Sequence, residues 1–134
     1  MKNGTPERSV FVLRRIAMYV NPVQIILEHT AASIKGDMDV IMSHYAEDAV
    51  IISANGVYRG HDQIRALNEN MLKNVVFPGT KFHIMDVRAE GNIGYGQWRA
   101  ENDKVEITYA VDTFVIRDGK IAVQTAGVVA GPKK

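Results

Sequence analysis

The chain has 134 residues, enough for one domain that buries about two-thirds of the surface exposed by its unfolded chain. Its net charge is only +1 and its lysines and arginines are scattered, so we expect no nucleic-acid partner. Because the chain contains no cysteine, disulfides, thiolate catalysis and cysteine-ligated zinc are excluded. The apolar run at residues 10–20 is interrupted by Arg14 and Arg15 and is too short to span a bilayer, so we expect a cytoplasmic protein with no membrane partner.

The next part of the chain shows helical periodicity. Asn21, with the proline that follows it, is typical of a helix start, and Gly36 is typical of a helix end. Apolar residues recur between them at helical spacing, which predicts an amphipathic helix. Two further helices are expected, one capped by Asp37 and running to about Tyr45, and one that follows Gly60.

Strands dominate the rest of the chain. They are predicted at residues 49–53, 80–90, 93–101, 104–117 and 120–129. The last four are separated by short breaks, which indicates an antiparallel meander, and strands of this length must twist or curl. Gly94 and Gly96 share one face, where the missing side chains allow bending or a close approach. We therefore expect an α+β fold in which a curved sheet wraps around the helices.

These elements divide the chain into three parts. A single domain is predicted at residues 21–130, with a tail at residues 131–134 and an N-terminal extension at residues 1–20. Three interpretations of the extension stay open: an extra helix that packs on a partner subunit, a disordered lead-in, or a segment ahead of the true start.

The most informative residue is Asp112, a lone carboxylate in the middle of the longest predicted strand. The pair Asp118-Gly119 predicts a two-residue hairpin turn, which would place Asp112 opposite Thr125 and on the same face as Phe114. A carboxylate on an apolar face is costly unless it is paired, hydrogen-bonded or protonated. Asp112 is therefore the first candidate for chemistry.

The preceding hairpin predicts the two faces of the sheet. A two-residue turn at residues 102–103 would place Tyr95 on the Asp112 face, and Trp98 and Tyr109 on the opposite face. Both faces are then substantially apolar, which one layer of helices cannot cover. We therefore expect a homodimer formed through the outer face of the sheet, the face turned away from the helices.

Two groups of segments carry a resemblance to a known superfamily. They are residues 36–37, 44–52 and 56–60 in the first half of the chain, and residues 111–114 and 117–121 in the last hairpin. In order and spacing they resemble the NTF2-like (SnoaL-like, ketosteroid isomerase-like) proteins, over about residues 22–129. The resemblance implies a cone of N-terminal helices packed in a curved antiparallel sheet, with an apolar pocket at its mouth. The superfamily includes isomerases, cyclases, dehydratases, epoxide hydrolases and non-catalytic adaptors, so the fold does not settle the function.

The resemblance also implies roles for three residues. Asp112 occupies the place of the ketosteroid isomerase carboxylic acid that donates to the substrate oxyanion. His29 falls where that enzyme has its oxyanion-hole tyrosine. The place of the general base is taken by Ser53, which cannot abstract a carbon-bound proton.

Our leading hypothesis is a cofactor-independent, dimeric NTF2-like protein that binds a small apolar compound with a carbonyl or hydroxyl group in its pocket. If it is an enzyme, we expect an isomerase or a dehydratase. Asp112 would donate to or accept from that oxygen, and His29 would move a proton. The residues expected to contact the substrate are Tyr95, Ser53, Phe114 and Thr125. The four histidines lack metal-ligand spacing, so we expect no metal. The alternative is a non-catalytic ligand-binding or oligomerising adaptor domain, which Ser53 favours.

Overall fold

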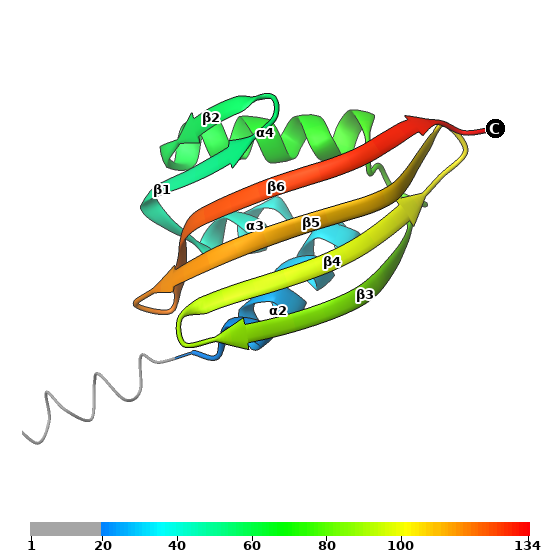
Figure 1. Cartoon of the computed structure of the whole chain (residues 1–134). Coiled ribbons are helices and arrows are strands. Elements are labelled where there is room, and N and C mark those ends of the chain that lie inside the picture. The colour runs from blue at the N-terminus through cyan, green and yellow to red at the C-terminus, as the bar shows by residue number, and fades with distance from the viewer. Residues whose placement is uncertain (1–19) are drawn as a thin grey trace, which may run out of the picture.

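The computed structural model describes residues 20–134 and confirms the α+β architecture (Figure 1). Its elements are α2 (Pro22–Lys35), α3 (Met38–Ser43), β1 (Tyr45–Ser53), β2 (Gly56–Arg59), α4 (Gly60–Asn74), β3 (Lys81–Glu90), β4 (Ile93–Glu101), β5 (Val105–Arg117) and β6 (Lys120–Pro132). The strands form one six-stranded sheet in the order β2-β1-β6-β5-β4-β3. Neighbouring strands are antiparallel, except that β1 and β6 are parallel. The predicted N-terminal extension lies outside the described residues, apart from Val20.

Local signals place the helix ends. The Asn21 side chain accepts a hydrogen bond from the Val23 amide at 2.9 Å, and Gly36 ends α2 in the left-handed region with φ 73°, as predicted. The second helix ends sooner than expected, at Ser43. Tyr45 already belongs to β1, because it pairs with Ile121 of β6. A long-range strand pair therefore overrides the local helical pattern here.

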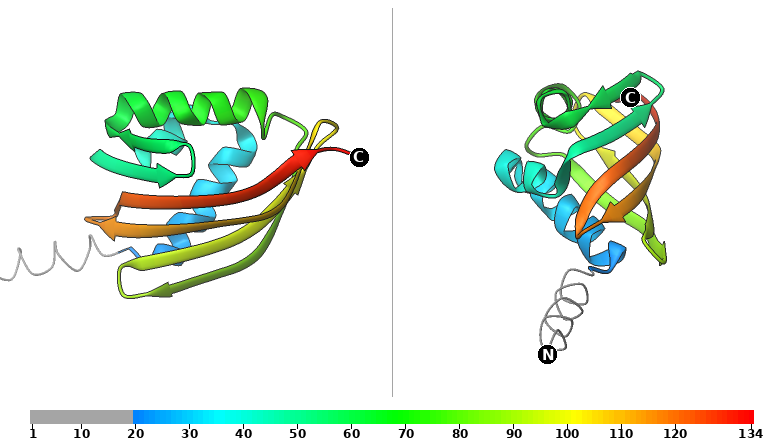
Figure 2. Two further views of the ribbon diagram at one scale, coloured as in Figure 1. Left: turned by 45° about the horizontal axis from the view of Figure 1, so that its top comes forward. Right: turned by 90° about the vertical axis from the view of Figure 1, so that its left-hand side faces the viewer.

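The sheet curls around the helices, and α2 lies in its concave face (Figure 2). Gly94 is where α2 and β4 come closest. A Cβ atom at Gly94 would lie 2.7 Å from Ile26 Cδ1 and 3.0 Å from Pro22 Cβ, whereas one at Gly96 would meet Ile26 Cγ2 at 3.5 Å. The predicted close approach at these glycines is confirmed.

One β-bulge in β5 changes which residues of β4 face the helices. Ala100 pairs with Ile107, but Trp98 pairs with Ala110, so Thr108 is an extra residue in β5. A bulge adds twist and reverses the faces of the residues that follow it. The bulge contributes to the curl of the sheet and decides what its concave face contains.

A second bulge lies in β6 at Ala122. Ile116 pairs with Ile121 as predicted, but Val115 pairs with Val123, so the faces reverse after the first pair. The two bulges overturn three predicted positions: Tyr95 and Thr125 lie on the outer face, and Trp98 lies on the inner face. Both faces are rich in apolar residues, so hydrophobic alternation by itself does not set the register.

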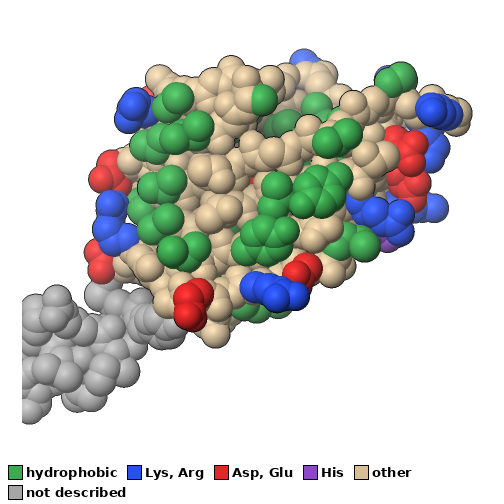
Figure 3. All heavy atoms as spheres, viewed as in Figure 1, with side chains coloured by type: hydrophobic (Ala, Val, Ile, Leu, Met, Phe, Trp, Pro, Cys, Tyr) green, Lys and Arg blue, Asp and Glu red, His purple; other side chains and the backbone are tan. Residues whose placement is uncertain are grey.

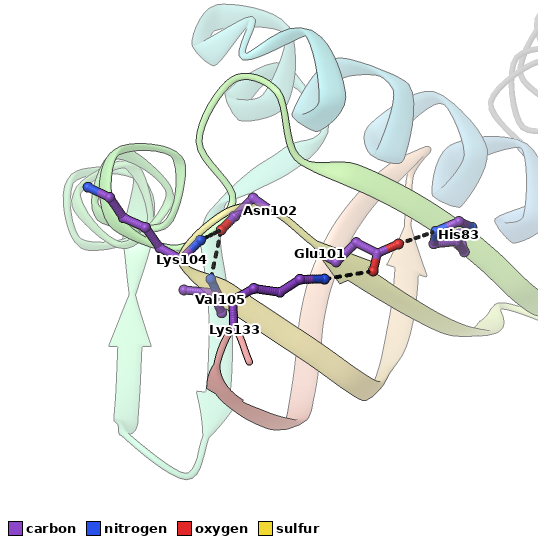
Figure 4. A network of polar contacts seen from close by, with 6 residues as sticks. All are labelled: His83, Glu101, Asn102, Lys104, Val105 and Lys133. Carbon is purple, nitrogen blue, oxygen red and sulfur yellow. Dashed lines mark hydrogen bonds and ion pairs between the residues drawn. The ribbon is translucent and has the colours of Figure 1, made fainter.

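The turn between β4 and β5 is built by one side chain, Asn102 (Figure 4). Its Oδ1 accepts hydrogen bonds from the amides of Lys104 at 2.9 Å and Val105 at 2.8 Å. The turn is longer than the predicted two residues, and Glu101 consequently pairs with Glu106 rather than with Lys104.

Other charges compensate Glu101. Its carboxylate lies 3.3 Å from Lys133 Nζ and 3.4 Å from His83 Nε2 (Figure 4), and hydrogen bonds from Lys133 and His83 lower the pKa of Glu101. The Lys133 amide also donates to the Lys104 carbonyl at 2.9 Å. Strand β6 thus continues past residue 129, where the predicted strand ends.

The buried core has two parts. The larger joins α2, α3 and α4 to β1, β5 and β6, with Ile41, Ile64 and Ile121 fully enclosed. The smaller lies around Val76, after α4, and Ile107. Side chains of both parts border the cavity described next.

Candidate functional site

A cavity of about 290 Å³ lies between the concave face of the sheet and helices α2 and α4. This volume is near the lower end for small-molecule sites, which are usually concave and mostly apolar. Four of the predicted site residues line the cavity: Asp112, His29, Ser53 and Phe114. The other two, Tyr95 and Thr125, project from the outer face because of the two bulges.

Asp112 lies on the cavity wall with a hydrogen-bond donor on each oxygen. Trp98 Nε1–H donates to Oδ2 at 2.8 Å, and Gln124 Nε2–H donates to Oδ1 at 3.1 Å. Burial raises the pKa of Asp112, and the two N–H donors oppose that rise by stabilising the carboxylate. The side chain is therefore partly desolvated, yet both of its oxygens have partners.

A chain of polar contacts runs from Asp112 through Gln124 to helix α2 and beyond. Gln124 Oε1 lies 2.5 Å from the Tyr45 hydroxyl, and that hydroxyl lies 3.3 Å from His29 Nε2. His29 Nδ1 in turn lies 3.1 Å from His44 Nδ1. The chain joins β5, β6, β1 and α2 and ends at the partly exposed ring of His44.

The direction of donation along this chain follows from its chemistry. Gln124 gives its N–H to Asp112, so its carbonyl oxygen accepts the single hydroxyl proton of Tyr45. The His29 contact with Tyr45 must then be donated by Nε2–H, which leaves Nδ1 of the neutral ring to accept from His44. Every proton in the chain is donated toward Asp112.

The proton transfer predicted for His29 stays a prediction, although its surroundings make this ring a weak base. Only 7% of its surface is exposed. Burial, with a smaller contribution from His44, lowers the pKa of His29 from 6.5 to about 3. Its route to Asp112 also passes through the amide of Gln124, which holds hydrogen bonds but does not readily relay a proton. The geometry makes His29 a group that orients the Tyr45 hydroxyl.

Ser53 and Asp112 lie in one row across the concave face. Ser53 pairs with Ala126, and Ala126 pairs with Asp112, so two strand spacings, or about 10 Å, separate the two backbones. Ala126 is small and leaves the space above it open. The Ser53 hydroxyl accepts a hydrogen bond from the Asn55 amide at 3.2 Å, at the exposed turn between β1 and β2.

Sequence reasoning missed Trp98, Gln124, Tyr45 and His44 as parts of this site. The sequence could not reveal Trp98 and Gln124 as site residues, because one-residue bulges turn their side chains inward. The sequence does carry one signal, since Gln124 is the only long uncharged polar side chain in the last strand. Tyr45 was assigned to the end of a helix rather than to a strand.

Two further properties concern residues 20–134 alone. Within them, no three histidine or acidic side chains come together in a way that could hold a metal ion. Over the same residues, each helix is too short or too polar to cross a membrane.

Comparisons with known proteins agree with the fold. The family model of the SnoaL-like domain matches residues 26–124. No curated protein matches the chain.

Three similar solved structures can be named. One is a SnoaL-like protein from Burkholderia thailandensis, 21% identical over 81% of this chain and 94% of that one, with a TM-score of 0.69. Another is an LEH-like epoxide hydrolase from M. tuberculosis, 16% identical over 81% and 82%, with a TM-score of 0.66. A protein provisionally named ketosteroid isomerase from Kribbella flavida is 11% identical over 83% and 79%, with a TM-score of 0.68. At these identities the likeness establishes the fold alone.

Proposed function

Because the chain belongs to the SnoaL-like family, we propose that its cavity binds a small, mainly apolar molecule with a carbonyl or hydroxyl group. Asp112 then moves a proton in a cofactor-independent isomerisation or dehydration. The proposal rests on one observation: the Asp112 carboxylate, which accepts hydrogen bonds from two N–H donors, lies on the wall of a mainly apolar cavity. The names of the epoxide hydrolase and the isomerase among the similar structures are consistent with acid–base chemistry.

The surroundings of Asp112 suit a general base. A raised pKa brings a carboxyl group closer to neutral pH, where a catalytic acid or base is most effective. In an isomerisation, the carboxylate takes a proton from the carbon beside a carbonyl and returns it to another carbon, so one group serves both steps. Trp98 and Gln124 hold the carboxylate in place throughout.

A simple enone tests this proposal. Wild-type protein is expected to convert a β,γ-unsaturated cyclohexenone to its conjugated isomer, followed by ultraviolet absorbance. Asp112→Asn should lower the rate by about 10²–10⁴-fold, which is the usual contribution of a general base. The matched control is Asp48→Asn, which removes an exposed carboxylate paired with Arg117 and should leave the rate unchanged. Equal rates for the two variants contradict a role for Asp112.

A second candidate function is ligand binding without catalysis. Ser53 favours this function. It lies in the same row of the sheet as Asp112, and its hydroxyl cannot act as the second carboxylate of an acid–base pair. This function predicts that indanol raises the melting temperature of the protein while no enone is converted. Asp112→Asn would then change ligand selectivity only.

We also propose a homodimer formed through an outer patch, defined as Ile52, Val57, Ile93, Tyr95, Tyr109, Val111 and Val129. These residues lie on the convex face of the sheet, where hydrophobic side chains gather (Figure 3). An exposed apolar area with charged groups at its edge, such as Arg99 and Glu101, is typical of a protein interface.

The dimer is tested by sedimentation velocity at micromolar concentration. Wild-type protein should sediment as a dimer, and Ile52→Lys should sediment as a monomer, because a lysine in the outer patch would be buried unpaired. Ile34→Lys is the matched control, since Ile34 is 50% exposed and belongs to α2, away from the sheet face. A monomeric wild type contradicts the proposal.

A further inference from the structure

We infer that the cavity selects its ligand by charge: it accepts neutral molecules, binds protonated amines most tightly and rejects carboxylates. The inference rests on the proposed function, because it concerns the ligand of the same cavity. It narrows the class of ligand to neutral and cationic molecules.

The first argument is the set of ionisable groups that line the cavity. Within residues 20–134, neither lysine nor arginine is among them. The titratable side chains are Asp112 from β5, His29 from α2 and Tyr45 from β1, while α4, β3, β4 and β6 supply apolar, amide and indole groups. Burial keeps His29 and Tyr45 neutral at physiological pH, so Asp112 is the side chain that can bring charge, and its charge is negative.

The second argument is that the donors closest to Asp112 already have acceptors within the protein. Trp98 and Gln124 give their N–H groups to Asp112, and Tyr45 gives its proton to Gln124. The hydroxyl of Thr30, another lining residue, donates to the Ile26 carbonyl at 2.8 Å. A ligand carboxylate placed beside Asp112 would meet like charge, whereas an ammonium group would find free lone pairs on both oxygens of Asp112.

The third argument is the aromatic wall next to Asp112. Trp98, which donates to Asp112, packs against Phe82 with ring centroids 5.6 Å apart, and both rings line the cavity. Phe114 lines it two residues along the strand from Asp112. The faces of such rings attract cations and repel anions. The carboxylate and the rings therefore favour the same sign of ligand charge.

The test uses three probes with one carbon skeleton: aminoindane, indanol and indane carboxylate, titrated into the full chain by isothermal calorimetry at neutral pH. Aminoindane should bind at least about a hundredfold more tightly than indane carboxylate. The ammonium group of aminoindane pairs with the Asp112 carboxylate, whereas the carboxylate of the other probe is repelled by it. Indanol should fall between them. Affinity for aminoindane should decrease as the pH falls through the pKa of Asp112, because protonation removes the carboxylate.

Asp112→Asn should abolish the preference for aminoindane over the carboxylate, and the matched variant Asp48→Asn should retain it. If Asp112→Asn does not fold, the pH dependence in the wild type decides the matter. Indanol binding with equal affinities for the amine and the carboxylate overturns charge selection and leaves the proposed ligand cavity intact. Failure of all three probes to bind overturns the ligand cavity itself, and charge selection with it.

Discussion

The inner and outer faces of the sheet are built from the same strands but have different roles. Both are rich in apolar side chains. The inner face is covered by α2 and α4 and contains a carboxylate supplied with donors, whereas the outer patch is open and apolar. Gly94 and Gly96 lie on the inner face, and the close contact of α2 at Gly94 depends on the missing side chain there. The glycines, more than the hydrophobic pattern, mark the face that accepts the helix.

The two faces should differ most in how much stability is lost when one of two consecutive isoleucines in β1 is truncated. Ile51 is 2% exposed on the inner face and Ile52 is 46% exposed on the outer face. Ile51→Ala should lower the free energy of unfolding by about 2–5 kcal/mol, because it removes buried methyl groups and leaves a hole. Ile52→Ala should lower it by less than about 1 kcal/mol in the monomer and weaken the dimer. Urea unfolding and sedimentation measure the two effects, and equal losses of stability would contradict the assignment of faces.

The glycines that accept α2 form the next comparison. Gly94→Ala should destabilise the protein by about 1–3 kcal/mol, since the new methyl group would overlap Ile26 and Pro22. Gly96→Ala places its methyl at an ordinary contact distance and should be nearly neutral. Thermal unfolding of the two variants in parallel measures the difference. Equal melting temperatures would mean that α2 does not approach β4 at Gly94.

Acid should destabilise the inner face through His29. Its pKa is about 3 in the folded protein and 6.5 when unfolded, so the unfolded state binds the proton more strongly between these values. Stability should be complete above pH 6.5 and should fall by about 2 kcal/mol by about pH 5, at about 1.4 kcal/mol per pH unit. Urea unfolding against pH measures this loss.

A second histidine of the chain, His83, provides the control for His29. His29→Gln retains a neutral side chain able to donate to Tyr45 and should remove most of the acid sensitivity. His83→Gln alters a histidine of the outer face and should leave the sensitivity in place. Asp112 acts in the opposite direction, because a raised carboxyl pKa makes stability fall as pH rises from 3.8 through the folded pKa.

The smallest expected difference in stability is between alanine variants of Gln124 and Thr125 in β6. Gln124→Ala should cost about 1 kcal/mol, because it leaves Oδ1 of Asp112 and the Tyr45 hydroxyl without their partner. It should also raise the pKa of Asp112 further, which a shift in the pH profile of aminoindane binding would reveal. Thr125→Ala on the outer face should change stability by less than about 0.5 kcal/mol and leave that profile unchanged. A shift in the profile of Thr125→Ala would place that residue at the cavity after all.

The sequence by itself determined most of the elements and their order, because helix caps and turns act over a few residues. Asn21, Gly36 and Asp118-Gly119 are local signals of this kind, and each lies where it was predicted. Asp112 could also be singled out, since an isolated carboxylate in an apolar strand requires partners.

Only the tertiary structure decided which partners Asp112 has. Single-residue bulges at Thr108 and Ala122 turn Trp98 and Gln124 inward. Because the strands are apolar on both faces, their hydrophobic pattern does not distinguish the observed register from the predicted one. The contact between Tyr45 and Gln124 joins residues 79 positions apart, which no local rule reaches. Local chemistry thus specifies the strands, while their register and the packing of α2 specify the site.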